Sequence, residues 1–75
     1  MIRITVGNTT NRKTVIEDES KTLRTVLEEN EIDYTTGMTQ LDGATLHPGD
    51  LDKSFADFGV TDHCSLLSVV KADNA

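Results

Sequence analysis

The segment from Ser54 to Val60 constrains the fold of this chain more strongly than any other. Ser54 can cap one helical turn, and Asp57 stands three residues later, where a capping box has its reciprocal partner. Three apolar side chains of the segment can enter a single core, namely Phe55, Phe58 and Val60. An apolar run of strand length follows from Cys64 to Val70 without a breaker, so the capped turn is predicted to lead into a closing strand.

A short hairpin is predicted upstream of this segment. The Asp42-Gly43 pair favours a tight turn, because glycine accepts positive φ without a Cβ clash. We therefore expect short strands at residues 36–41 and 44–46. Pro48 has no backbone donor, so residues 47–50 are predicted to form a second turn that ends the hairpin.

The beginning of the chain predicts another antiparallel hairpin. Ile2, Ile4 and Val6 alternate with polar residues, which is the period of a strand with one buried face. Turn-forming residues fill positions 7–11, and the strand formers of Arg12–Glu17 follow. Two strands joined by so short a turn are expected to pair with each other.

One short helix is predicted after this hairpin, over residues 22–30. Leu23, Val26 and Leu27 stand at i, i+3 and i+4, so their side chains form one apolar stripe. Ser20 or Thr22 can supply the N-terminal cap. Because the stripe is short, the helix is expected to be short as well.

The order of these elements indicates an α+β fold, in which one helix packs on one face of a mixed sheet. The first and last strands are the most hydrophobic. If they are neighbours in the centre of the sheet they run parallel, because a long crossover through the helix joins them. We expect one domain over residues 1–71 and a polar tail over residues 72–75.

The chain resembles the ubiquitin-like β-grasp superfamily over nearly its full length. The segments that carry this resemblance are Met1–Val6, Lys13–Glu17, the helix around Thr22-Leu23 and Val26-Leu27, Leu41–Leu46, and Phe55–Val60 followed by Leu66 and Val69. Residues 20–32 are also similar to the helix of the bacterial sulfur-carrier branch. The loop of residues 47–52 is slightly longer than its counterpart in ubiquitin itself.

The end of the chain departs from the pattern of the carriers in this superfamily. Their conjugation and sulfur transfer depend on a C-terminal Gly-Gly whose carboxylate is adenylated, whereas the last glycine here is Gly59. The resemblance therefore does not imply carrier activity. It implies a small, non-enzymatic interaction module or adaptor that binds a protein partner. The alternative is a degenerate ubiquitin-like or sulfur-carrier protein that docks an adenylating enzyme without being activated.

The formal charge of −6 is distributed unevenly along the chain. Residues 1–25 carry five basic against three acidic residues, and residues 26–75 carry two basic against ten acidic ones. An acidic chain repels phosphate backbones, which argues against nucleic acid as the partner. The charge either serves solubility or forms an acidic face that docks a basic partner.

The apolar segments and the single cysteine limit the cellular compartments in which the protein is expected. Cys64 is the single cysteine, so an intrachain disulfide is impossible. The first residues alternate rather than forming the apolar core of a signal peptide. No apolar run approaches the roughly 20 residues that span a bilayer. We therefore expect a cytoplasmic protein that does not bind membranes.

No catalytic, cofactor or metal site is predicted. Cys64 stands beside His63, but consecutive strand residues point to opposite faces, so the two do not form a nucleophile–base pair. We expect Cys64 to be a small, partly buried apolar group, and an enzyme that uses its thiol is the alternative. Neither His47 nor His63 has partners at a metal-ligand spacing.

The closing strand carries apolar side chains of both parities, and these cannot all pack against one helix. We expect Leu67, Val69 or Val15 to be exposed on the open face of the sheet, with Met38 or Gln40 beside it. This face is the predicted site for a protein partner, or for a second copy of the chain in a homodimer. The alternative is that neighbouring side chains cover the strand and no partner binds there.

Overall fold

The computed structural model describes residues 1–69. The predicted domain end at residue 71 and the predicted tail of residues 72–75 lie outside this part of the chain. The helices and strands of residues 1–69, in chain order, are β1 (Ile2–Asn8), β2 (Arg12–Glu17), α1 (Leu23–Glu29), β3 (Met38–Leu41), β4 (Ala44–Thr45), the 3₁₀ helices η1 (Pro48–Asp52) and η2 (Ala56–Phe58), and β5 (His63–Val69).

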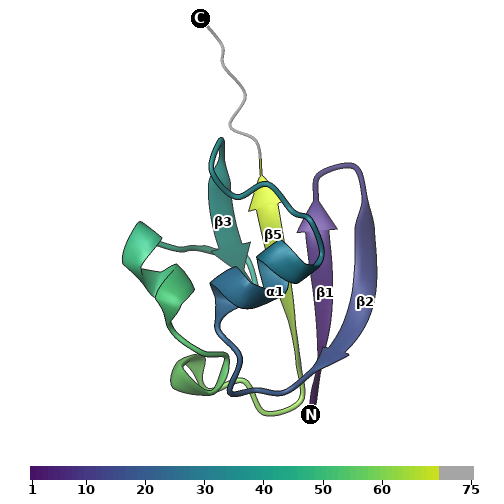
Figure 1. Ribbon diagram of the computed structural model, residues 1–75, viewed down its shortest axis with the longest axis vertical. Coiled ribbons are helices and arrows are strands. Elements are labelled where there is room, and N and C mark those ends of the chain that lie inside the picture. Colours follow the sequence, from purple (N-terminus) through teal and green to yellow (C-terminus); the bar gives the residue numbers. More distant parts are fainter. Residues whose placement is uncertain (70–75) are drawn as a thin grey trace, which may run out of the picture.

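The strands form one mixed sheet in the order β2-β1-β5-β3-β4 (Figure 1). β1 and β5 are parallel neighbours in its interior, with Ile4 opposite Cys64 and Val6 opposite Leu66. The other neighbouring pairs are antiparallel. The chain between β1 and β5 passes through α1, which supplies the long crossover that parallel neighbours require. The predicted α+β arrangement is confirmed.

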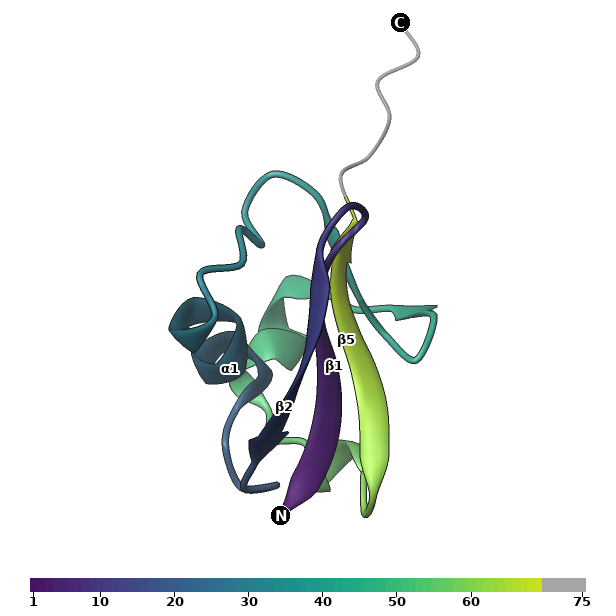
Figure 2. The ribbon, with the colours of Figure 1, turned by 90° about the vertical axis from the view of Figure 1, so that its right-hand side faces the viewer.

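The core lies between α1 and one face of this sheet. Figure 2 shows α1 on one side of β1, β2 and β5. The residues of the core are Ile2, Ile4, Val6, Leu23, Val26, Leu27, Leu41, Leu51, Phe55, Cys64 and Leu66. Most of these side chains come from every second residue of the strands and from one stripe of α1, so the two periods predicted from the sequence meet at a single interface. Leu51 of η1 and Phe55, just before η2, complete the core.

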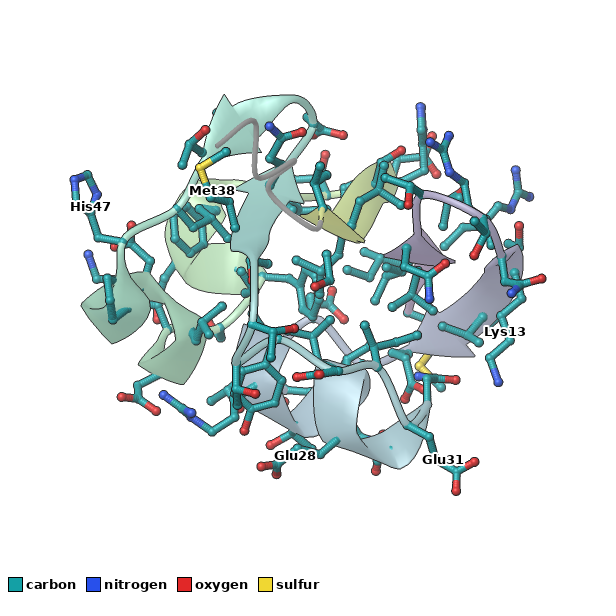
Figure 3. The ribbon with its side chains drawn as sticks, turned by 90° about the horizontal axis from the view of Figure 1, so that it is seen from above. Lys13, Glu28, Glu31, Met38 and His47 are labelled. Carbon is teal, nitrogen blue, oxygen red and sulfur yellow. The ribbon has the colours of Figure 1, made fainter. Side chains whose placement is uncertain are left out.

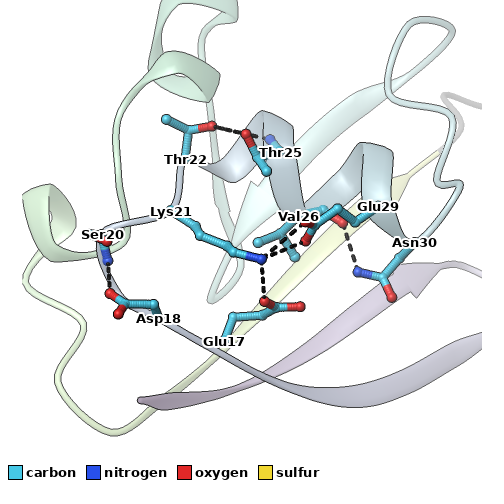
Figure 4. Close-up of polar contacts among 9 residues, drawn as sticks. All are labelled: Glu17, Asp18, Ser20, Lys21, Thr22, Thr25, Val26, Glu29 and Asn30. Atoms are coloured by element: carbon cyan, nitrogen blue, oxygen red, sulfur yellow. Dashed lines mark hydrogen bonds and ion pairs between the residues drawn. The ribbon is translucent and has the colours of Figure 1, made fainter.

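Side-chain contacts fix the N-terminal end of α1 beside the sheet. The Oγ1 of Thr22 accepts a hydrogen bond from the backbone N–H of Thr25 at 3.2 Å, which makes Thr22 the N-cap. Lys21 lies between two carboxylates, with its Nζ 2.9 Å from Glu17 of β2 and 3.0 Å from Glu29 of α1 (Figure 4). The hydrogen bonds to these carboxylates raise the pKa of Lys21. This contact ties the helix to the edge strand.

The C-terminal end of α1 closes in a Schellman motif. The backbone N–H of Glu31 donates to Glu28 at 3.1 Å, and that of Ile32 donates to Leu27 at 2.9 Å. Glu31 has a φ of 58°, a left-handed conformation that normally favours glycine. Ile32 then packs against the core and covers the end of the helix.

The capped turn predicted at Ser54 is present as η2. The backbone N–H of Ser54 donates to the Asp57 carboxylate at 3.0 Å, and the N–H of Asp57 donates to the Ser54 Oγ at 3.1 Å. Phe55 follows the cap and is fully buried. Gly59 ends the turn with a φ of 77°, and the chain then enters β5. The capping box thus sets the direction from which the closing strand enters the sheet.

The second hairpin is shorter than predicted. Asp42 and Gly43 have φ values of 51° and 87°, so the tight turn is confirmed. β3 begins at Met38 rather than at residue 36, because the Asp33 carboxylate binds Thr35 and Thr36 in a turn of their own. The predicted turn at residues 47–50 is present, with the backbone N–H of Asp50 donating to the His47 carbonyl at 2.9 Å, and it continues as the 3₁₀ helix η1.

Candidate functional site

The strands present a second face, which points away from α1 and which we call the open face. Residues paired across neighbouring strands point to the same side, so the register assigns each strand residue to one face. Arg3 and Thr5 of β1 belong to the open face because they lie between the buried Ile2, Ile4 and Val6. The open-face residues of the other strands are Arg12, Thr14 and Ile16 of β2, His63, Ser65, Leu67 and Val69 of β5, Met38 and Gln40 of β3, and Thr45 of β4.

Four of the predicted partner-binding residues meet on this face. Gln40 lies opposite Leu67, and Met38 lies opposite Val69, on the neighbouring strands β3 and β5. We call these four residues the open-face patch. Leu67, Val69 and Gln40 are half-buried, and Met38, labelled in Figure 3, is 39% exposed.

Gly7 explains why Leu67 stays accessible although it lies on an interior strand. Leu67 is flanked in the register by Gly7 on β1 and by Gln40 on β3. Glycine has no side chain, so β1 places none beside Leu67 in this row of the sheet. A Cβ at Gly7 would lie 2.1 Å from the backbone oxygen of Asn11, so the tight β1–β2 connection requires glycine there.

The structure separates Val15 from the open-face patch. Val15 lies opposite the fully buried Ile4 and packs against the core, so its side chain points to the helix-covered face. Its neighbour Ile16 takes the open face instead and is 57% exposed. Ile16 lies opposite Arg3 of β1, and Arg3 lies opposite His63 of β5. Along β5, His63 is two residues from Ser65 and four residues from Leu67. Ile16 therefore does not extend the patch.

The open face carries basic rather than acidic strand residues. Arg3 and Arg12 both point to it and are exposed, and its strand positions include no Asp or Glu. Within residues 1–69, neither arginine forms an ion pair, whereas Lys21 and Arg24 on the helix side are both paired with carboxylates. The charged strand residues of this face are therefore basic, while the carboxylates of Asp42 and Asp62 adjoin it at Ser65 and His63.

The sulfur of Cys64 is placed inside the core. Cys64 is 2% exposed, and the side chain of His63 lies on the other face of β5 and is 73% exposed. Burial, together with the nearby Asp42 carboxylate, raises the pKa of the Cys64 thiol to about 11. At neutral pH the group is a thiol, which is a poor nucleophile, so the arrangement does not support the alternative of an enzyme that uses Cys64.

The second histidine, His47, takes part in a helix cap. The backbone N–H of His47 donates to the Asp50 carboxylate at 2.9 Å, and this hydrogen bond lies at the start of η1. In the part of the chain that the structure describes, no three His, Cys, Asp or Glu side chains are grouped to hold a metal ion. The seven residues of α1 are too few to cross a membrane, and no other helix within residues 1–69 has the length and apolar character to do so.

Comparison with known proteins places the fold in a class. No protein-family model and no curated protein matches the sequence. The solution NMR structure of the ubiquitin-like domain of an Arabidopsis thaliana protein is similar to this chain, with a TM-score of 0.66 and 23% identity over 99% of this chain and 81% of that one. A second structure of the same protein, from evolutionary couplings and sparse NMR data, has a TM-score of 0.61 and 23% identity over 97% and 89% of the two chains.

These similarities, together with the strand order, show that the chain has a ubiquitin-like β-grasp fold. The fold predicted from the sequence is therefore confirmed. Both similar structures come from a plant protein, so the likeness of residues 20–32 to a bacterial sulfur-carrier branch stays a prediction.

Proposed function

We propose that this chain is a non-enzymatic protein-interaction module, an adaptor that binds a partner protein through the open-face patch. One observation carries the proposal: the interior strand β5 holds Leu67 and Val69, two apolar side chains that stay half-exposed on the face away from the helix. An interior strand that served only the core would gain solubility from polar residues at these positions. Apolar side chains there favour a surface that another protein covers.

The surroundings of the patch indicate the chemistry of its partner. Arg12 lies in the same row of the sheet as Gly7, Leu67 and Gln40, and it has no carboxylate partner within residues 1–69. A partner that places an apolar side chain beside Leu67 and a carboxylate near Arg12 would match both features. Apolar centres with a charged rim are the usual anatomy of such interfaces. A second copy of the chain is a further partner that could cover the same patch.

The experiment compares three forms of the full chain as affinity baits in a lysate of the source organism. Leu67→Asp places a charge in the patch, and Thr14→Asp is the matched control on the same face of the edge strand β2. We expect partners retained by the wild type and by Thr14→Asp to be lost by Leu67→Asp. A recovered partner is then titrated by calorimetry, where Leu67→Asp should weaken binding by at least about tenfold.

Sedimentation of the same three proteins tests the homodimer, and circular dichroism confirms that each variant is folded. The proposal fails if folded Leu67→Asp retains every partner with unchanged affinity and also leaves self-association unchanged. Formation of an ATP-dependent adduct with an adenylating enzyme would instead support the carrier alternative.

A further inference from the structure

A groove of about 460 Å³ lies beside β3, on the side of that strand away from β5. It is bounded by the start of β3, by the connection between β4 and η1, and by Arg24 of α1. The apolar residues that line it are Tyr34, Met38, Leu46, Pro48 and Leu51. Met38 and His47, both labelled in Figure 3, are among its lining residues. We call it the β3-edge groove.

The groove opens because β4 is too short to cover β3. The ladder between the two strands includes the pair Leu41 and Ala44, and the backbone N–H of Leu46 then donates to Thr39 at 2.8 Å. In an antiparallel ladder the next residue on this side of β3 is Gly37, and its counterpart would be Pro48. Pro48 lacks an N–H and turns into η1, so the ladder stops. No backbone hydrogen bond joins Gly37 to another described residue, and Gly37 lines the groove.

Carboxylates surround the groove and are held in place by its lining residues. Each of four carboxylates accepts a hydrogen bond from one such residue. The pairs are Asp52 with Arg24 at 2.9 Å, Glu28 with the Tyr34 hydroxyl at 2.6 Å, Asp33 with the Thr35 N–H at 2.9 Å, and Asp50 with the His47 N–H at 2.9 Å. Two cations lie among these carboxylates, namely Arg24 in the lining and Lys53, whose Nζ is 3.5 Å from Asp50. The groove therefore has an acidic rim, in contrast to the open face.

We propose that the β3-edge groove binds an extended peptide segment of a partner protein in which lysine or arginine alternates with aliphatic residues. The peptide backbone pairs with the exposed edge of β3 at Gly37, in the way a further strand is added to a sheet. An aliphatic side chain enters the groove between Met38, Leu46 and Pro48. The basic side chains face Asp52, Asp50 and Glu28. The site is independent of the open-face patch except for Met38, which borders both.

The probe for this site is a short fluorescein-labelled peptide of alternating lysine and valine, titrated with the full chain at physiological ionic strength. We expect saturable binding, and we expect ¹⁵N NMR to show the largest shifts at the amides of Gly37, Thr39 and Leu46. A peptide with glutamate in place of lysine, and a peptide with N-methylated valines, should not bind. The first removes the charge match and the second removes the strand pairing.

Two single substitutions separate a specific site from general attraction to an acidic chain. Asp52→Asn removes a rim carboxylate and releases Arg24, and should weaken binding by roughly threefold or more. Asp62→Asn makes the same charge change at a carboxylate remote from the groove and should leave affinity unchanged. Equal effects of the two substitutions, binding of the glutamate peptide, or shifts confined to other parts of the chain would each overturn the proposal. Leu67→Asp should not affect this peptide, so the open-face proposal can fail while this one stands.

Discussion

The two faces of the sheet are built from the same strands, yet they have different environments. On β5, Cys64, Leu66 and Ser68 are at most 2% exposed, whereas the alternate residues Leu67 and Val69 are half-buried. Alternation along the strand thus gives one set of side chains to the core and the other set to the surface. Neighbouring leucines of one strand can therefore have different tasks: the inner Leu66 stabilises the fold, and the outer Leu67 is available for recognition.

The charges follow the same division. The helix side holds the paired cations Lys21 and Arg24 and the carboxylates that cap its turns. The open face holds Arg3 and Arg12, which form no ion pair within residues 1–69. Charges on the helix side therefore take part in local structure, even where they border the β3-edge groove as Asp52 does, while Arg3 and Arg12 on the open face have no such carboxylate partner within residues 1–69.

The adjacent residues Leu66 and Leu67 offer the most direct test. Leu66→Ala removes a fully buried side chain from the core and should lower the free energy of unfolding by about 2–5 kcal/mol. For a chain of this size that is a large share of the total stability, so the variant should be mostly unfolded near 37 °C. Leu67→Ala removes a half-exposed side chain and should cost about 1 kcal/mol or less. Urea unfolding followed by circular dichroism measures both values, and equal losses would contradict the assignment of the faces.

The two serines of β5 repeat the comparison with polar groups. The Ser68 Oγ donates to the backbone carbonyl of Asp33 at 2.6 Å and is buried beneath the segment that leads to β3. Ser68→Ala should therefore cost about 1–2 kcal/mol. Ser65→Ala, on the open face of the same strand, should stay within about 0.5 kcal/mol of the wild type. The division would be in doubt if chemical denaturation gave the larger loss for Ser65→Ala.

Much of the fold could be predicted from local patterns. The alternation of Ile2, Ile4 and Val6 and the spacing of Leu23, Val26 and Leu27 each identify one buried face, and the structure places both in the core. The capping box of Ser54 and Asp57 could also be predicted, because its two hydrogen bonds join residues three positions apart. Such features need no knowledge of distant parts of the chain.

The candidate site depended on register, which local patterns do not determine. Val15 and Ile16 are consecutive β-branched residues, so alternation requires opposite faces but does not say which one points outward. The pairing of Val15 with Ile4 decides it, and a shift of one residue would exchange the two. The β3-edge groove was missed for a similar reason, because it exists only where the pairing between β3 and the β4 segment stops short of Gly37. Pro48 was the available signal, since its missing N–H limits the ladder.

The helix side also contains a strained position that can be relieved. Glu31 has a φ of 58° at the end of α1, where a side chain costs about 1 kcal/mol relative to glycine. Glu31→Gly should therefore raise the free energy of unfolding by up to about 1 kcal/mol. Glu28→Gly, the same change inside the helix, should lower it by at least about 1 kcal/mol, because it also removes the carboxylate that accepts from the Tyr34 hydroxyl. Thermal melts of the two variants should shift in opposite directions, and a loss of stability in Glu31→Gly would contradict the left-handed helix end.

The smallest predicted effect concerns acid stability, which should depend on the caps of the helix side. The backbone N–H of Ser54 holds the pKa of Asp57 below its usual value of 3.8. A carboxylate whose pKa is lower in the folded than in the unfolded state stabilises the fold above the unfolded pKa, and this contribution is lost as the pH falls through the folded pKa. The wild type should therefore lose stability below about pH 4. Asp57→Asn should show a shallower loss over the same range, because its amide does not titrate.

Asp62→Asn is the control for this experiment, because the Asp62 side chain is 92% exposed and lies outside the capping box. Between pH 7 and pH 3, the urea midpoint of this variant should fall with decreasing pH as steeply as that of the wild type. The open-face patch contains no titratable group, so Leu67→Ala should also leave the slope unchanged. If Leu67→Ala reduced the loss of stability at low pH as much as Asp57→Asn does, the pH dependence would not arise from the capping carboxylates. The division of charge between the two sides of the molecule would then be wrong.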